Sequence, residues 1–133
     1  MSEENVEVVR QVFEAFNRRD WAAWKSHHDP DVEWHDPPGV PGGGVHRGAG
    51  PIVRFLEETL ETAAEWRADV EEVESVGHDR VLMRGRSVVV WRGTSVPMED
   101  PLVVLFDLDQ GRVRRVRHFR SSTEALEVAG LEE

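Results

Sequence analysis

Residues 31–39 read DVEWHDPPG, a segment in which strand-forming residues lead to an acid and two prolines. Alternate residues of a strand share one face, so Val32, Trp34 and Asp36 project together, away from Glu33 and His35. The prolines that follow predict the end of the strand. Because an unpaired buried carboxylate is costly, Asp36 predicts a polar functional group inside an apolar pocket.

Two amphipathic helices are predicted ahead of this strand. The first begins near Ser2, a common N-cap residue, and its apolar residues recur at helical spacing. These are Val6, Val9, Val12, Phe13 and Phe16. The second helix follows Asp20, carries Trp21 and Trp24 on one face, and ends near His28.

The rest of the chain divides into further elements at turn signals. We expect a loop at 39–50 and a helix at 51–64. Four strands follow at 66–76, 80–91, 97–108 and 112–120, and a last helix at 123–129. Four consecutive strands joined by tight turns predict an antiparallel meander. The apolar run 102–106 is typical of a central strand that is covered on both faces.

Helices followed by a meander predict an α+β fold, in which a curved antiparallel sheet wraps around three N-terminal helices. The length of 133 residues fits one domain spanning residues 1–133. A curved sheet closed by helices encloses a cavity, and such concave apolar sites are where small molecules usually bind.

Composition argues against several classes of partner. The formal net charge of −10 would repel nucleic acid and anionic membranes. The chain has no Cys, and the spacing of its six His matches no zinc signature, so neither a metal nor another cofactor is expected. The acidic N-terminus and the lack of a long apolar run predict a cytoplasmic protein.

Three segments carry a resemblance to a known family. They are NRRDW (17–21), DPDVEWHDPPG (29–39) and HRGAGPIVRFLEE (46–58). In their order and chemistry, from about residue 6 to residue 131, the chain resembles the nuclear transport factor 2-like superfamily, and within it the SnoaL-like branch. The resemblance implies a cone-shaped, cystatin-like α+β domain with a deep pocket, usually in a homodimer packed through the outer face of the sheet. Activities in this superfamily are diverse, so the fold implies little about the reaction.

The resemblance extends distantly to ketosteroid isomerases, whose general base precedes a proline on the first strand, as Asp36 precedes Pro37. The positions that correspond to their two oxyanion donors are Val12 and Val103, and the chain has no Tyr. Losing one such donor costs about two to three orders of magnitude in rate, so ketosteroid isomerisation is not expected. SnoaL-like cyclases use an acid near the end of the last strand, where this chain has Ser121.

On the last predicted strand, Val116, His118 and Arg120 share a face. If Val116 marks the inner side, His118 and Arg120 confront Asp36 across the cavity. Asp36 would then be a general base or acid, His118 a second proton carrier and Arg120 an anchor for an oxyanion or carboxylate. In the alternative interpretation, Asp36 and Arg120 form a buried ion pair with His118 hydrogen-bonded nearby.

The candidate ligand-binding residues are Trp34, Met83, Trp91, Val103 and Val116, although large aromatic residues and Met fill cores more often than they meet ligands. We expect a domain that binds a small apolar or ring-containing molecule. If it is an enzyme, it would be an isomerase, cyclase or hydro-lyase that uses acid–base catalysis without a cofactor. The alternative is a non-catalytic ligand-binding or protein-assembly domain.

Overall fold

The structure, a computed structural model, describes residues 2–37 and 43–132. Its elements in chain order are α1 (Ser2–Arg18), α2 (Trp21–Ser26), β1 (His28–His35), β2 (Val45–Arg47), α3 (Ala49–Glu61), β3 (Ala63–Ser75), β4 (Arg80–Trp91), β5 (Met98–Asp109), β6 (Arg112–Phe119) and α4 (Ser122–Leu131). The predicted order is confirmed, with one correction. Segment 39–50, predicted as a loop, contains β2 and the start of α3, while residues 38–42 lie outside the described part of the chain.

All six strands form one sheet in the order β2-β1-β6-β5-β4-β3. Strands β3 to β6 form the predicted antiparallel meander, and β2 pairs antiparallel with β1. The sheet is not antiparallel throughout, because β1 and β6 run parallel. Parallel neighbours require a long crossover, and here α3 and the first three meander strands supply it.

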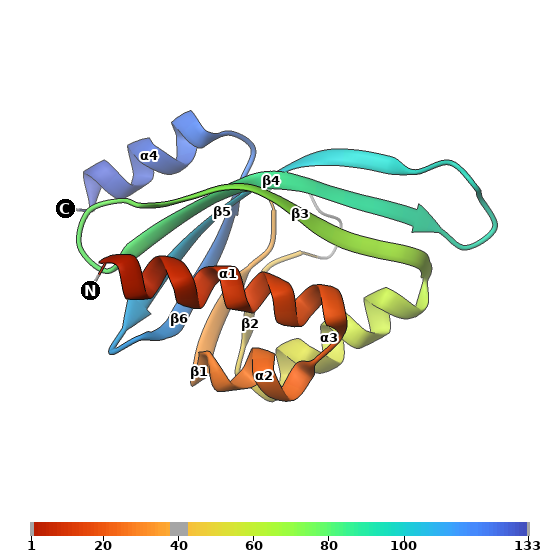
Figure 1. Cartoon of the computed structure of the whole chain (residues 1–133), viewed down its shortest axis with the longest axis horizontal. Coiled ribbons are helices and arrows are strands. Elements are labelled where there is room, and N and C mark those ends of the chain that lie inside the picture. Colours follow the sequence, from red (N-terminus) through yellow and green to blue (C-terminus); the bar gives the residue numbers. More distant parts are fainter. Residues whose placement is uncertain (1, 38–42, 133) are drawn as a thin grey trace.

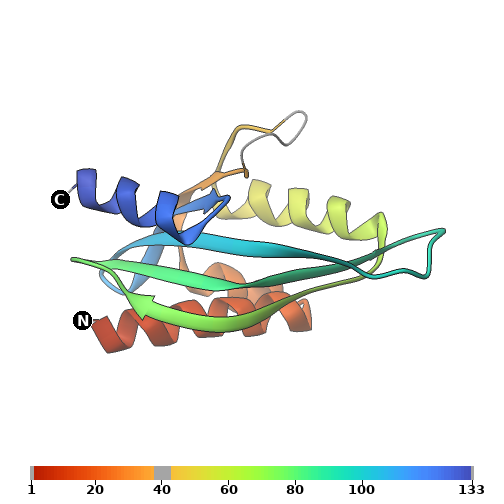
Figure 2. The same cartoon turned by 90° about the horizontal axis from the view of Figure 1, so that it is seen from above.

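The helices lie on both faces of the sheet. In Figure 1, α1, α2 and α3 lie below β3, β4 and β5, the lower parts of β6, β1 and β2 pass behind α1, and α4 lies above the strands. The larger core fills the space between the first three helices and the inner face of the sheet, and a smaller core lies under α4. Figure 2 shows the strands bending across these helices. The predicted α+β class with a curved sheet around three N-terminal helices is thus confirmed.

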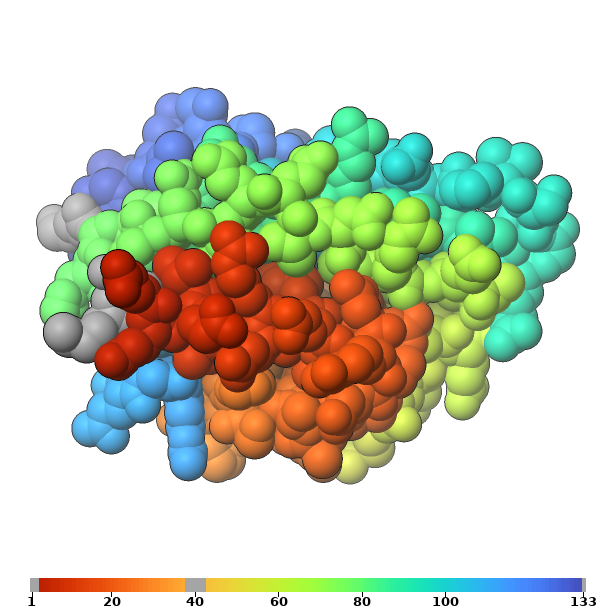
Figure 3. All heavy atoms as spheres, viewed as in Figure 1, coloured from red at the N-terminus to blue at the C-terminus, as the bar shows by residue number. Residues whose placement is uncertain are grey.

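Helix α1 covers the edge of the sheet at β3. Asn17 donates from Nδ2 to the carbonyl oxygen of Ala68 at 2.9 Å and accepts from its amide at 2.9 Å. Edge strands expose unpaired backbone groups, and this amide side chain satisfies one residue of β3 as a neighbouring strand would. Figure 3 shows α1 lying along β3 on this side of the molecule.

Strand β3 also approaches β4 closely. The pairing register shifts between Val70 and Glu72, which marks a bulge. A Cβ added to Gly85 of β4 would overlap the carbonyl oxygen of Asp69 just before this bulge, so only glycine fits there. Such a bulge bends the edge strand and increases its local twist.

A network of charged residues holds the end of α4 on the outer face of the sheet. We call this network the Asp107 cluster; its members are Asp107, Glu132, Arg80, Arg115 and Arg117. Asp107 is 2% exposed and accepts hydrogen bonds from all three arginines, including Arg80 Nε at 2.8 Å. Glu132, just after α4, accepts from Arg117 at 2.8 and 3.0 Å. The cluster therefore ties the C-terminal end of α4 to β4, β5 and β6.

Candidate functional site

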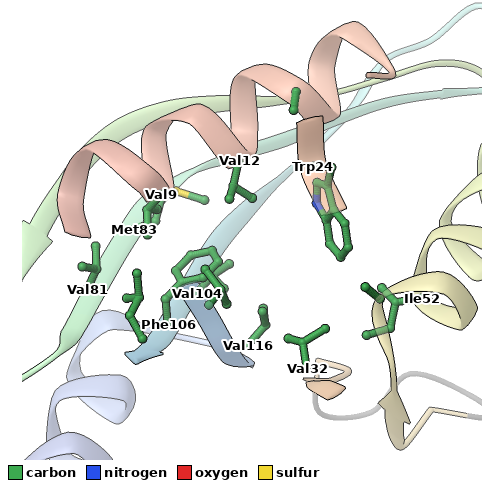
Figure 4. Packing of buried hydrophobic residues seen from close by; sticks show 14 of the residues in the cluster. Val9, Val12, Trp24, Val32, Ile52, Val81, Met83, Val104, Phe106 and Val116 are labelled. Atoms are coloured by element: carbon green, nitrogen blue, oxygen red, sulfur yellow. The ribbon is translucent and has the colours of Figure 1, made fainter. Parts of the chain in front are cut away.

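A cavity of about 90 Å³ lies between α1, α2 and α3 and the inner face of the sheet. Its lining residues are Val12, Phe13, Phe16, Trp24, His28, Trp34, Leu56, Trp66, Ala68, Ser87, Leu102, Val104, Phe106, Val116 and His118. Figure 4 shows Val12, Trp24, Val104, Phe106 and Val116 directed into this interior from the helices and the strands. The walls are thus apolar, and His28, Ser87 and His118 carry the polar groups other than indole nitrogens.

His118 lines the cavity from β6, as predicted. Its Nδ1 donates to the carbonyl oxygen of His35 at 2.8 Å, so the lone pair of a neutral ring is on Nε2. Its ring packs against the indole of Trp34 with centroids 4.8 Å apart. Burial lowers the pKa of His118, against the hydrogen bond to His35 and the negative charge of Asp36, which favour the protonated ring.

Asp36 lies just after β1 on the same side as Trp34, and its side chain is 8% exposed. One carboxylate oxygen, Oδ1, accepts from Trp34 Nε1 at 3.1 Å. The other, Oδ2, accepts from the amide of Gly44 at 3.1 Å and from His46 Nε2 at 2.8 Å. Asp36 is not among the residues that line the cavity, which corrects the prediction that its carboxylate lies inside the pocket. Its oxygens instead join β1 to β2, and the His46 ring in turn stacks on Phe55 with centroids 4.4 Å apart.

Arg120 lies outside the predicted constellation. Strand β6 ends at Phe119, so the alternation that turns His118 inward does not extend to Arg120. Its side chain is exposed and does not line the cavity. Within residues 2–37 and 43–132, no ion pair joins Arg120 to Asp36, so the predicted ion pair between them is not formed.

The five predicted ligand-binding residues divide into two groups. Trp34 and Val116 line the cavity. Met83 is fully buried in the larger core, and Trp91 is partly buried at the end of β4, but neither lines the cavity.

Val103 lies on the opposite face of the sheet. It packs with Leu105 and with Ala125 of α4 in the smaller core, while its neighbour Val104 faces the cavity beside His118. The inward residues of β5 at the cavity are Leu102, Val104 and Phe106, none of which can donate a hydrogen bond through its side chain. The predicted inward orientation of Val103 is therefore wrong.

His28 is a cavity residue that the sequence pattern did not indicate. It begins β1, and its ring stacks on Trp24 with centroids 3.6 Å apart and an interplanar angle of 19°. Its Nδ1 donates to the carbonyl oxygen of Trp24 at 2.6 Å. Burial lowers the pKa of His28 to about 4, so the ring is neutral near pH 7. The only signal in the sequence was a second His directly after a helix.

Among residues 2–37 and 43–132, no group of three or more His, Asp or Glu side chains is arranged to hold a metal ion. No helix in that part of the chain is long and apolar enough to span a membrane.

Solved structures similar to this chain share its fold. A nuclear transport factor 2-like protein of unknown function from Burkholderia pseudomallei is 25% identical, with a TM-score of 0.80, covering 97% of this chain and 98% of its own. TerC, co-crystallised with polyporic acid, is 24% identical with a TM-score of 0.78, covering 96% and 98%. A candidate polyketide cyclase from Xanthomonas campestris is 19% identical with a TM-score of 0.73, covering 96% and 98%.

A comparison with curated proteins finds no match to the chain. The family model of the SnoaL-like domain matches residues 9–116, which include the cavity-lining residues from α1 to Val116 of β6. The protein belongs to the SnoaL-like domain family.

Proposed function

We propose that the protein binds a small, largely apolar, ring-containing molecule in the cavity. The observation that carries this proposal is the composition of the walls, in which six aromatic side chains surround the space. These are Phe13, Phe16, Trp24, Trp34, Trp66 and Phe106. Aromatic side chains pack against a ring by offset stacking or edge-to-face contact, and the few polar groups then select its orientation.

The size of the cavity limits the ligand. Its volume of about 90 Å³ is far below the roughly 300 Å³ or more of sites for drug-sized ligands. An apolar cavity of about 150 Å³ admits benzene. A single ring would therefore fit after small outward movements of the lining side chains.

Family membership supports this proposal. The related structures include a protein co-crystallised with polyporic acid and a candidate polyketide cyclase. We extend to this chain only the general class, a small molecule that contains a ring.

A second candidate function is proton transfer without a cofactor, as in an isomerase, cyclase or hydro-lyase. It is favoured by His118, whose Nε2 lone pair belongs to a ring that lines the cavity. Ser87 accepts a hydrogen bond from Trp66 Nε1 at 3.0 Å, which leaves its own hydroxyl proton to donate to a ligand oxygen. In this mechanism Asp36 positions His118 through Trp34 and stabilises the protonated imidazole, and it does not touch the ligand.

The first test is the binding of toluene and cyclohexane, which is measured by thermal unfolding and by NMR of the aromatic side chains. We expect both ligands to raise the melting temperature and to shift resonances of the lining residues. No stabilisation and no shifts would contradict the binding proposal. Ring compounds with acidic C–H groups are then incubated with the protein and analysed for product. Turnover that His118→Phe abolishes supports catalysis, and ligand recovered unchanged supports binding alone.

The homodimer and the cytoplasmic location remain predictions. In a dimer packed through the outer face of the sheet, α4 would lie at or beside the interface, because it covers part of that face. Sedimentation of the purified protein across a concentration series measures the state of association directly. A single species with the monomer mass of 15.1 kDa would contradict the predicted dimer.

A further inference from the structure

His28 combines deep burial with an unused acceptor. The residue is 2% exposed, and Nδ1 donates its proton to the carbonyl oxygen of Trp24. A carbonyl oxygen only accepts, so the proton of the neutral ring resides on Nδ1 and Nε2 carries a lone pair. Within the described chain, Nε2 has no hydrogen-bond partner.

The imidazole of His28 belongs to the cavity wall, but Nε2 itself is covered, so a ligand reaches it only through the small outward movements that also admit a ring. His28 lines the cavity together with Trp24, on whose indole its ring is stacked. The stack and the Nδ1 hydrogen bond fix the position of the imidazole, so Nε2 is held in place before any ligand arrives. Buried acceptors in native proteins nearly always find a partner, and one left without a partner destabilises the folded protein.

The charge of the cavity indicates which partner fits. None of the residues that line it is Lys or Arg, and Arg120, the predicted anchor for an anion, is exposed. A carboxylate in this space would be buried without a fixed cation, which is costly. A neutral hydroxyl group instead donates to the imidazole while its ring contacts the aromatic walls.

We propose that His28 Nε2 is the polar anchor of the cavity, and that the ligand is a neutral ring compound that carries a hydroxyl group, such as a phenol. This inference rests on the proposed function, because it requires the cavity to bind a ring. The inference also gives the orientation of the ligand in the cavity. Its hydroxyl group points to the junction of α2 and β1, and its ring points toward the sheet.

The experiment compares phenol with toluene, which have nearly the same shape and differ in the donor. Phenol leaves water less readily than toluene, so the two affinities are first corrected for this difference in transfer free energy. After the correction, we expect phenol to bind the wild-type protein roughly tenfold more tightly than toluene. The His28→Phe variant keeps an aromatic ring beside Trp24 but lacks the acceptor, so this preference should fall to about one. The matched control is His27→Gln, which alters the neighbouring imidazole that does not line the cavity.

A second measurement uses only the wild-type protein and so does not depend on the folding of His28→Phe. The ¹⁵N resonance of His28 Nε2 should move upfield when phenol binds and stay in place when toluene binds. Equal binding of both ligands with an unchanged ¹⁵N resonance would overturn the role of His28 and leave the proposed function standing. A preference for phenol that persists in His28→Phe would overturn it too. Binding of neither ligand would overturn the proposed function itself.

Discussion

Trp34 donates a hydrogen bond from its indole Nε1 to Asp36 Oδ1 at 3.1 Å. The two residues are two positions apart, as expected for side chains on one face of a strand. The Trp34 indole also contacts the ring of His118. The buried acid therefore shapes the cavity wall through an aromatic residue, and in the proposed binding mode the imidazoles of His28 and His118 supply acceptors for a ligand.

Replacing Asp36 by Asn tests this structural role. An amide cannot accept at both oxygen positions, so Asp36→Asn directs an NH₂ group at a donor on either Trp34 or His46. Leaving a buried group unpaired costs about 1–3 kcal/mol, and we expect a loss of this size in the free energy of unfolding measured with urea. The control, Asp31→Asn on the exposed side of β1, should change it by no more than about 0.5 kcal/mol. Equal effects of the two substitutions would contradict the role given to Asp36.

The strand pattern identified which side Asp36 occupies but not what it contacts. Its partners His46 and Gly44 lie in the segment 39–50. The abundant Gly and Pro of this segment predict a loop, so the sequence does not indicate the three-residue strand β2. The turn signals were more informative. Gly77 and Asp79 have positive φ angles of 67° and 55°, and β4 begins at Arg80, as the sequence predicted.

The face of β5 could not be derived from its sequence, because residues 102–106 are apolar on both sides of the strand. Helix α4 covers one face and the cavity lies at the other, so Val103 and Val104 meet equally apolar surroundings. His28 was missed for a related reason. A polar residue after a helix ordinarily lies in solvent, and only the packing of α2 against β1 buries it.

The stability of the protein should fall in mild acid because of His28. Its pKa is lowered to about 4 by burial, against 6.5 for an ordinary imidazole, so protons bind the unfolded state more tightly. The stabilisation is complete above pH 6.5 and is lost as the pH falls toward 4, at about 1.4 kcal/mol per pH unit. His118, whose pKa burial also lowers, adds a change of the same sign. Urea unfolding at several pH values measures the slope.

The variant that isolates this effect is His28→Phe, which should show a clearly smaller loss of stability between pH 6.5 and 4. The His27→Gln control changes a ring that is only partly buried and whose charge is the smallest cause of the lowered pKa of His28, so it should retain nearly the wild-type slope. If His28→Phe and the wild-type protein lose stability in parallel, His28 binds a proton equally well in the folded and unfolded states, and the environment described here is wrong.

The Asp107 cluster should be the most sensitive charged site on the outer face. Arg80, Arg115 and Arg117 share two carboxylates, and Asp107→Asn removes the buried one while Glu132 remains. Breaking a buried ion pair costs roughly 3–5 kcal/mol. We expect a loss of that order in urea unfolding and faster amide hydrogen exchange in α4. Asp109→Asn, at an exposed position on the same strand, is the control and should have little effect. Unchanged exchange in α4 after Asp107→Asn would contradict the proposed attachment of this helix.

The central claim is that a cavity on the inner face of the sheet binds an apolar ring, and Ala68→Leu tests it most directly. Ala68 lines the cavity, so the larger side chain should fill it, preserve the melting temperature and abolish the binding of toluene. The matched variant, Ala125→Leu, enlarges a buried alanine under α4 that does not line the cavity. Overpacking there should cost about 1–3 kcal/mol and leave toluene binding intact. Toluene that binds Ala68→Leu as tightly as the wild-type protein would contradict the account.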